Sequence, residues 1–184
     1  MHKIINIPNS LSLLRIILSF VFAIALVYGH LMSAIVILFT AGITDFLDGY
    51  TARKLNLVSQ FGAALDPLAD KILMFVTYIS FSIINLIPSY VAAVVIARDI
   101  MILLAVVGCI CSQVQLKMAP IMSSKINTTI QITYLLFVLT CNYFQIHITS
   151  INECFTWLVV TTTIWSGVEY VQKYWWIGKA IFKQ

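Results

Sequence analysis

The chain has 184 residues, of which 61% are hydrophobic and 10% are charged, and its formal net charge at pH 7 is +4. Soluble domains usually contain about 45–50% apolar and about 25% charged residues, so this composition excludes an ordinary soluble domain. The cations are scattered and form no patch interleaved with aromatic residues, so the positive charge does not indicate a nucleic-acid partner.

Six mostly apolar segments, each about 20 residues long as a membrane-spanning helix requires, can be placed along the chain. They cover residues 9–29, 32–53, 62–85, 88–112, 124–144 and 151–172. The sequence therefore predicts an all-α, polytopic membrane protein with six transmembrane helices, forming a single domain over residues 1–184.

Lysine and arginine residues gather at one set of segment ends. The turns after the first, third and fifth segments contain neither, whereas the opposite ends carry Arg53, Lys54, Lys117 and the lysines of the C-terminal tail. The positive-inside rule then places both termini in the cytoplasm.

The first segment begins after polar residues between Asn6 and Ser12, which predict a short interfacial stretch leading into the span. Arg15 would lie about two turns inside the helix. There its side chain either reaches back to the membrane surface or finds a partner within the bundle. Nothing in the start of the chain resembles a cleavable leader, so we expect none to be removed.

Acidic residues are concentrated where the second segment ends and the third begins. Four of the seven in the chain lie there, namely Asp45, Asp48, Asp66 and Asp70. Spacings of three and four residues put each pair on one helix face. Ionised Asp costs about 2.5–3.5 kcal/mol near the centre of a spanning helix, so a cationic partner must offset four of them.

Carboxylates without a nearby His or Cys suit hard divalent cations such as Mg²⁺ or Mn²⁺, and four are enough for two ions. Small residues next to them, Gly49, Ala52 and Gly62, allow a ligand or helix to approach closely. Arg53 adds positive charge that favours a phosphate. The residues alone thus predict a metal and phosphate site facing the cytoplasm. A plain charged loop is the alternative, but it would shorten both helices to below or near the length needed to span.

The later segments carry fewer polar residues. Asn127 and Gln131 are expected to bond to neighbouring helices, a common use of amides in membrane proteins. Four cysteines, Cys109, Cys111, Cys141 and Cys154, lack the spacing of a zinc site or a disulfide framework. We expect them to be small buried side chains.

The spacing Asp-x2-Asp-Gly-x2-Ala-Arg-x8-Gly-x3-Asp-x3-Asp, from Asp45 to Asp70, resembles the pattern of the CDP-alcohol phosphatidyltransferases, with all eight fixed positions present. The resemblance implies that the four aspartates hold two divalent ions that bind the diphosphate of a CDP-linked lipid. It assigns Gly49, Ala52, Arg53 and Gly62 to that lipid and makes Asp70 the general base for the acceptor hydroxyl. It also implies a homodimer.

Within that family, the residues around Arg15 and Lys71 resemble the branch that uses glycerol-type acceptors. The stretches around Arg98 and Lys125 are more similar to cardiolipin synthases, which use phosphatidylglycerol, than to phosphatidylglycerophosphate synthases, which use glycerol 3-phosphate. Arg15, Lys71, Arg98 and Lys125 are therefore the expected acceptor-binding residues. Alternatively, Arg98 pairs with Asp99 and Lys125 lies at the membrane surface. The motif begins at Asn6 with no presequence before it, so we expect a bacterial protein of the cytoplasmic membrane and not a mitochondrial precursor.

Two functions of other classes are compatible with carboxylates in a membrane. A metal-ion transporter would be expected to carry polar groups leading to both faces, often on broken helices. A structural membrane protein gives no reason for four aspartates within the spans. The sequence favours the enzyme over both.

Overall fold

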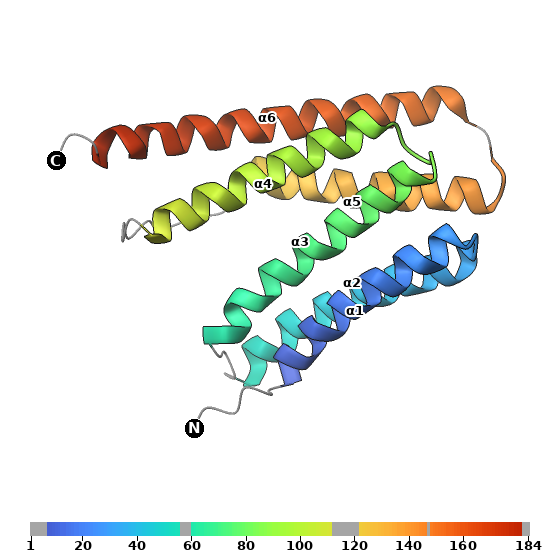
Figure 1. Ribbon diagram of the computed structural model, residues 1–184, viewed down its shortest axis with the longest axis horizontal. Helices are drawn as coiled ribbons and strands as arrows, with labels where there is room; N and C mark the ends of the chain where they lie inside the picture. The colour runs from blue at the N-terminus through green and yellow to red at the C-terminus, as the bar shows by residue number, and fades with distance from the viewer. Residues whose placement is uncertain (1–6, 56–59, 112–121, 147, 182–184) are drawn as a thin grey trace. The chain divides into compact units, whose positions relative to one another are not determined.

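The computed structural model describes residues 7–55, 60–111, 122–146 and 148–181, with side chains described for 12–44, 68–105, 122–146 and 148–173. These residues form six helices and no strand, which confirms the all-α prediction (Figure 1). The helices are α1 (Ile7–Val27), α2 (Leu31–Leu55), α3 (Gln60–Ile83), α4 (Ser89–Cys111), α5 (Met122–Tyr143) and α6 (Thr149–Ile181).

The helix boundaries lie within two residues of the predicted ones except at the end of α6, and the differences in α1 and α6 have consequences. Helix α1 begins at Ile7, so the residues expected to form a separate interfacial stretch belong, from Ile7 onwards, to its first turns. Pro8 fits there because the first N–H groups of a helix need no partner within it. Helix α6 continues to Ile181, beyond the predicted end at residue 172; residues 173–181 contain no proline to interrupt it.

Helices α1, α3 and α5 end in the same way. In each, one residue has a positive φ: Gly29 at 78°, Asn85 at 58° and Gln145 at 55°. The next N–H then donates back to a carbonyl in the last turn, as when Leu86 N bonds Phe81 O at 2.9 Å. This is the Schellman cap, which satisfies carbonyls that the helix leaves open. Each cap leads within a few residues into the next helix.

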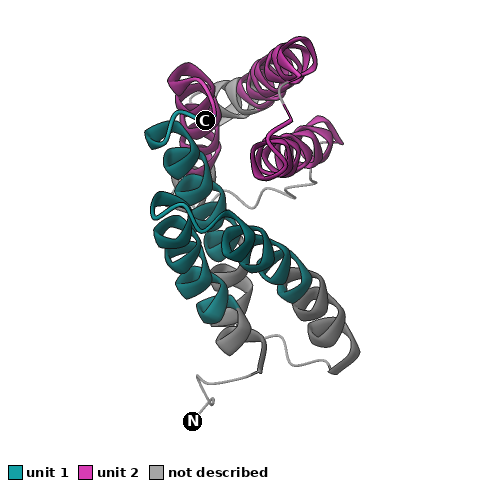
Figure 2. Cartoon of the chain, turned by 90° about the vertical axis from the view of Figure 1, so that its right-hand side faces the viewer, with its two compact units in different colours: residues 1–86 teal, residues 87–184 magenta. Residues whose placement is uncertain are grey.

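The chain divides into two compact units, residues 1–86 and 87–184 (Figure 2). In the first unit, α1 packs against both α2 and α3. Alanines at positions 34 and 41, seven residues apart, are fully buried on α2, and small residues allow helices to approach closely. Phe22 of α1 and Phe81 of α3 stack with ring centroids 6.2 Å apart.

In the second unit, α6 packs against both α4 and α5. Phe137 of α5 and Phe155 of α6 stack with ring centroids 5.0 Å apart. On α5 the buried positions are Ser123, Asn127, Gln131, Tyr134, Leu135, Val138 and Leu139. Spacings of three and four residues along this set define one helix face, which therefore mixes polar and apolar groups.

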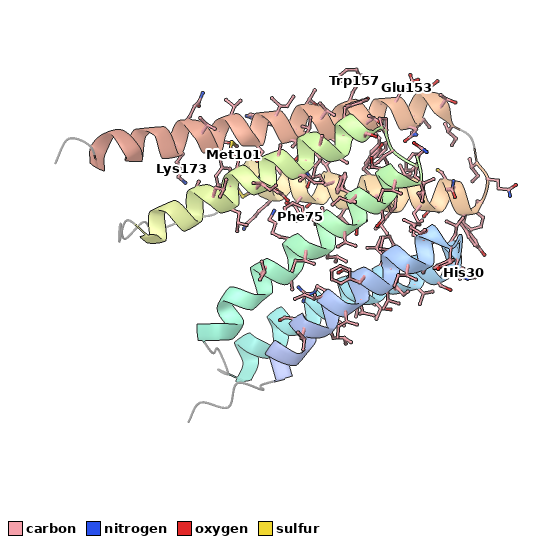
Figure 3. All side chains as sticks on the ribbon, viewed as in Figure 1. His30, Phe75, Met101, Glu153, Trp157 and Lys173 are labelled. Atoms are coloured by element: carbon pink, nitrogen blue, oxygen red, sulfur yellow. The ribbon has the colours of Figure 1, made fainter. Side chains whose placement is uncertain are left out.

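Large apolar side chains are also exposed on these helices. Phe20, Phe39, Trp157 and Trp165 are each more than half exposed, and Trp157 projects outward from α6 (Figure 3). Within the described parts of the chain, no helix combines the length and apolar character that crossing a membrane would need.

The prediction of buried cysteines is wrong for Cys154, whose side chain on α6 is exposed, and Cys141 is only half-buried. Cys154 lies at a surface formed largely by apolar residues such as Ile151 and Trp157, where a small apolar side chain needs no burial. The side chains of Cys109 and Cys111 lie outside the described residues.

Candidate active site

The aspartate pattern occupies the end of α2 and the start of α3. Asp45 and Asp48 are helical positions of α2, and Asp66 and Asp70 are helical positions of α3. The helices therefore run through both clusters, as the length needed for the two spans predicted. The positions assigned to the CDP-linked lipid are helical too: Gly49, Ala52 and Arg53 in α2, and Gly62 in α3.

Asp70 is the one member of this pattern whose side chain is described, and it is half-buried. It follows the fully buried Ala69 and lies one turn before the buried Leu73 and Met74, on the part of α3 that packs in the first unit. Its neighbour Lys71 is also half-buried. The side chains of the other pattern residues, Asp45, Asp48, Asp66, Gly49, Ala52, Arg53 and Gly62, lie outside the described residues.

Arg15 is buried in the first unit, with only 1% of its surface exposed. It lies on α1 between the buried Ser12 and Ser19, on the same face as Phe22, which stacks on α3. The sequence left two positions open for the Arg15 side chain, at the surface or within the bundle. The structure places it within the bundle. A buried guanidinium needs compensation, because removing a charge from water costs several kcal/mol.

A second polar centre lies inside the second unit around Arg98 of α4. Its Nη1 donates to Oδ1 of Asp99 at 2.7 Å, and both side chains are almost fully buried. Its Nη2 donates to Oγ of Ser124 on α5 at 2.8 Å and to Oγ of Ser166 on α6 at 2.6 Å. Its guanidinium carbon lies 5.6 Å from the ring centroid of Tyr170. One side chain therefore joins all three helices of the unit.

The pairing with Asp99 offsets the positive charge of Arg98. Both groups are desolvated, so their attraction is weakly screened and the pair is close to neutral as a unit. Lys125, which follows Ser124, is exposed and lies outside this buried centre. The structure thus realises the paired arrangement of Arg98 that the sequence left open, and it places Lys125 at the surface.

A ladder of polar contacts between α5 and α6 continues from this centre. Oδ1 of Asn127 accepts bonds from Thr162 and Thr163, each at 3.0 Å. Gln131 bonds Thr163 at 3.1 Å, and the Tyr134 hydroxyl lies 2.9 Å from that of Thr156. The expectation that Asn127 and Gln131 bond to a neighbouring helix is confirmed.

The partners on α6 were not predicted from the sequence. Thr156, Thr163 and Tyr170 are seven residues apart, which places them on one stripe of a helix, and Ser166 lies between the last two. That spacing of hydroxyl-bearing residues within an apolar segment was the available signal. It is weak, because Thr161 belongs to the same run and, among the described contacts, its hydroxyl bonds only to carbonyls of α6 itself.

Metal binding was predicted at the four aspartates. Among the side chains that the structure describes, no three His, Cys, Asp or Glu residues gather to hold an ion, and three of the four aspartate side chains lie outside that set. The chemistry of the donor set itself fits the prediction, since four carboxylates offer the oxygen ligands that hard divalent cations take.

Comparison with known proteins identifies relatives over most of the chain. Residues 5–165 match the family model described as CDP-alcohol phosphatidyltransferase. The chain is 34% identical, over 92% of its length and 95% of the relative, to the CDP-diacylglycerol–glycerol-3-phosphate 3-phosphatidyltransferase of Bacillus subtilis.

Two further relatives match a shorter part of the chain. It is 42% identical to the human cardiolipin synthase (CMP-forming) over 55% of the chain and 34% of that protein. It is 46% identical to the CDP-diacylglycerol–glycerol-3-phosphate 3-phosphatidyltransferase of Aquifex aeolicus over 42% of the chain and 43% of that protein. The chain thus spans less than half the length of these two relatives.

Proposed function

The chain belongs to the CDP-alcohol phosphatidyltransferase family and is an enzyme of phospholipid biosynthesis, and from this premise we propose that it transfers a phosphatidyl group from CDP-diacylglycerol to phosphatidylglycerol. The products would be cardiolipin and CMP. Similarity to a cardiolipin synthase supports this proposal. Because membership identifies an enzyme, the ion-transporter and structural interpretations are dropped.

The observation that carries the choice of acceptor is the buried pair of Arg98 and Asp99. Glycerol 3-phosphate brings a phosphate monoester with nearly two negative charges, whereas phosphatidylglycerol brings a phosphodiester with one. The positive charge of Arg98 is already offset by Asp99, so little of it remains to compensate a second negative charge on a desolvated phosphate. The phosphodiester of phosphatidylglycerol, with one negative charge, is therefore favoured over the phosphate monoester. Hydroxyl and guanidinium groups of the protein can still donate hydrogen bonds to the oxygens of that phosphodiester.

Glycerol 3-phosphate is the second candidate acceptor, with phosphatidylglycerophosphate as product. The relative from Bacillus subtilis supports it, because its name specifies that acceptor and the similarity extends over nearly the full length of both chains. The similarity to the human cardiolipin synthase covers a smaller part.

Asp45, Asp48, Asp66 and Asp70 would hold two divalent cations, Mg²⁺ or Mn²⁺, through oxygen ligands. Bound there, the ions would supply positive charge for the diphosphate of the donor lipid and for the departing CMP. Gly49, Ala52, Arg53 and Gly62, which lie in α2 and α3 beside the aspartates in sequence, would bind the CDP end of that lipid.

Asp70 would act as general base. Its carboxylate takes the proton of the acceptor hydroxyl as that oxygen forms a bond to the phosphorus carrying the diacylglycerol. The bond from this phosphorus to the oxygen of CMP breaks, and CMP leaves with the electron pair. The half-buried state of Asp70 suits the role, because the base must touch substrate yet remain shielded from bulk water. Arg15, Lys71, Arg98 and Lys125 would bind the acceptor.

We further propose that the six helices span a bacterial cytoplasmic membrane, with both termini and the active site on the cytoplasmic side. The large exposed apolar side chains on the helices support this placement, since water would be a poor solvent for them. The chain would form one catalytic domain over residues 1–184 and assemble as a homodimer in the bilayer.

The test is an acceptor assay on purified protein in detergent with Mg²⁺ or Mn²⁺ and CDP-diacylglycerol. We expect release of CMP and formation of cardiolipin when phosphatidylglycerol is supplied, and loss of both after chelation with EDTA. Release of CMP with glycerol 3-phosphate alone would replace the first candidate with the second. Undiminished activity after chelation would refute the proposed ions.

A further inference from the structure

The guanidinium of Arg98 contacts side chains from three helices. Ser124 and Ser166 together accept both hydrogens of its nitrogen Nη2. Nη2 carries two hydrogens, and the two serine oxygens at 2.8 Å and 2.6 Å accept one each. Asp99 accepts a hydrogen from Nη1. These contacts fix the plane of the guanidinium, because its donors form a rigid fork.

Nε of Arg98 is also buried, but it has no hydrogen-bond partner among the described residues. Buried donors in folded proteins are nearly always paired, because an unpaired one costs about 1–3 kcal/mol. The serines and Asp99 therefore hold the guanidinium in an orientation that leaves this N–H for an oxygen from elsewhere. A bound acceptor offers such an oxygen in its phosphate or hydroxyl groups.

The two serines meet Arg98 because the α5–α6 ladder sets the register of their helices. Asn127, one turn after Ser124, accepts from Thr163, one turn before Ser166. The stem of Arg98 also runs along α6, where a methyl group added at Gly167 would lie 3.6 Å from Cγ of Arg98. The stem and the nitrogen Nη2 are thus both constrained by α6.

We propose that Ser166, together with Ser124, is a positioning residue that orients Arg98 toward the phosphate or glycerol oxygens of the acceptor. This inference rests on the proposed function, because it assumes that Arg98 binds the acceptor. Neither serine touches the substrate in this proposal; each acts through the guanidinium.

The experiment measures CMP release while phosphatidylglycerol and CDP-diacylglycerol are varied in turn. We expect Ser166→Ala and Ser124→Ala each to raise the KM for phosphatidylglycerol about tenfold, which corresponds to about 1.4 kcal/mol. The KM for CDP-diacylglycerol should stay within about twofold of the wild type. Ser166→Thr keeps a hydroxyl group, so its KM for phosphatidylglycerol should be close to that of the wild type.

The matched control is Thr161→Ala, because Thr161 is exposed on α6 and its hydroxyl bonds to carbonyls of its own helix. It should leave both KM values unchanged. If Ser166→Ala does not fold, Ser124→Ala decides, since Ser124 is only half-buried and tolerates truncation better.

Three outcomes would overturn the inference. If Ser124→Ala has an unchanged KM for phosphatidylglycerol, even with a lower Tm, the contact between Ser124 and Arg98 contributes only to stability. Equal increases in both KM values would show a general loss of geometry. Absence of CMP release by the wild type with phosphatidylglycerol and with glycerol 3-phosphate would refute the proposed function as well, whereas the first two results leave that function intact.

Discussion

Gln131 of α5 donates from Nε2 to Oγ1 of Thr163 on α6 across 3.1 Å, at a point where both side chains are almost fully buried. The same hydroxyl group donates to Oδ1 of Asn127, 3.0 Å away. One threonine therefore satisfies parts of two amides on the facing helix. In an apolar environment such shared bonds fix the register of two helices, because sliding one helix along the other would break both bonds.

Thr163→Val should lower the free energy of unfolding by about 1–3 kcal/mol, because the substitution keeps the shape but removes two buried hydrogen bonds, each worth about 0.5–1.5 kcal/mol. Thermal unfolding in detergent would measure this as a lower Tm. Thr161→Val is the control, since the Thr161 hydroxyl is exposed and bonds only within α6 among the described contacts. Equal Tm values for the two variants would contradict the role given to the ladder.

Gln145→Gly should stabilise the second unit by about 0.5–1 kcal/mol, because the left-handed backbone of Gln145 costs a residue with a Cβ more than it costs glycine. Its φ of 55° lies in the Schellman cap of α5, where glycine is the usual residue. A higher Tm is the expected measurement.

The matched control is Gln172→Gly, at an exposed position inside α6, where the same change should destabilise by about 1 kcal/mol. A Tm that falls in both variants would mean that the cap of α5 gains nothing from glycine.

The sequence predicted the six helices because apolar runs of span length, separated by polar or Gly and Pro residues, leave little choice of element. It also predicted that helices run through Asp45 and Asp70, since excluding these residues would leave spans too short. Both predictions depend on local composition. The prediction that Cys154 is buried was wrong, because the burial of a single residue depends on which face of its helix packs against other helices. Composition does not determine that face.

The Arg98 centre could be predicted only in part, for a similar reason. Arg98 and Asp99 are neighbours in sequence, so their pairing was a visible possibility. Ser166 is 68 residues away, and its contact with Arg98 depends on the register of α4 against α6. A serine in an apolar helix is common and bonds equally well to its own backbone. Only the packing of the helices shows which serine meets the guanidinium.

Asp70→Asn should reduce CMP release by about 10²–10⁴-fold, because an amide cannot take the proton of the acceptor hydroxyl. The variant should remain folded and still bind CDP-diacylglycerol, at least in part, in an equilibrium assay with labelled lipid. Glu153→Gln is the control, because it also removes one negative charge but at an exposed position of α6. Full activity of Asp70→Asn would remove Asp70 as the base.

Asp99→Asn should shift acceptor preference toward glycerol 3-phosphate. The change removes the carboxylate 2.7 Å from Nη1 of Arg98 and leaves a positive charge with less compensation in the interior. A phosphate monoester with nearly two negative charges then gains more than a phosphodiester with one. We expect the ratio of CMP release with glycerol 3-phosphate to that with phosphatidylglycerol to rise about tenfold, or about 1.4 kcal/mol.

Loss of the carboxylate also breaks a buried ion pair, which typically costs about 3–5 kcal/mol of stability, so less of the protein will be active. The ratio is the right measurement for that reason, because both acceptors are assayed on one preparation and the active fraction cancels. Glu153→Gln changes the net charge equally without touching Arg98 and should leave the ratio unchanged. An unchanged ratio in Asp99→Asn would show that compensation of Arg98 does not set the acceptor, and the choice of phosphatidylglycerol would lose its physical basis.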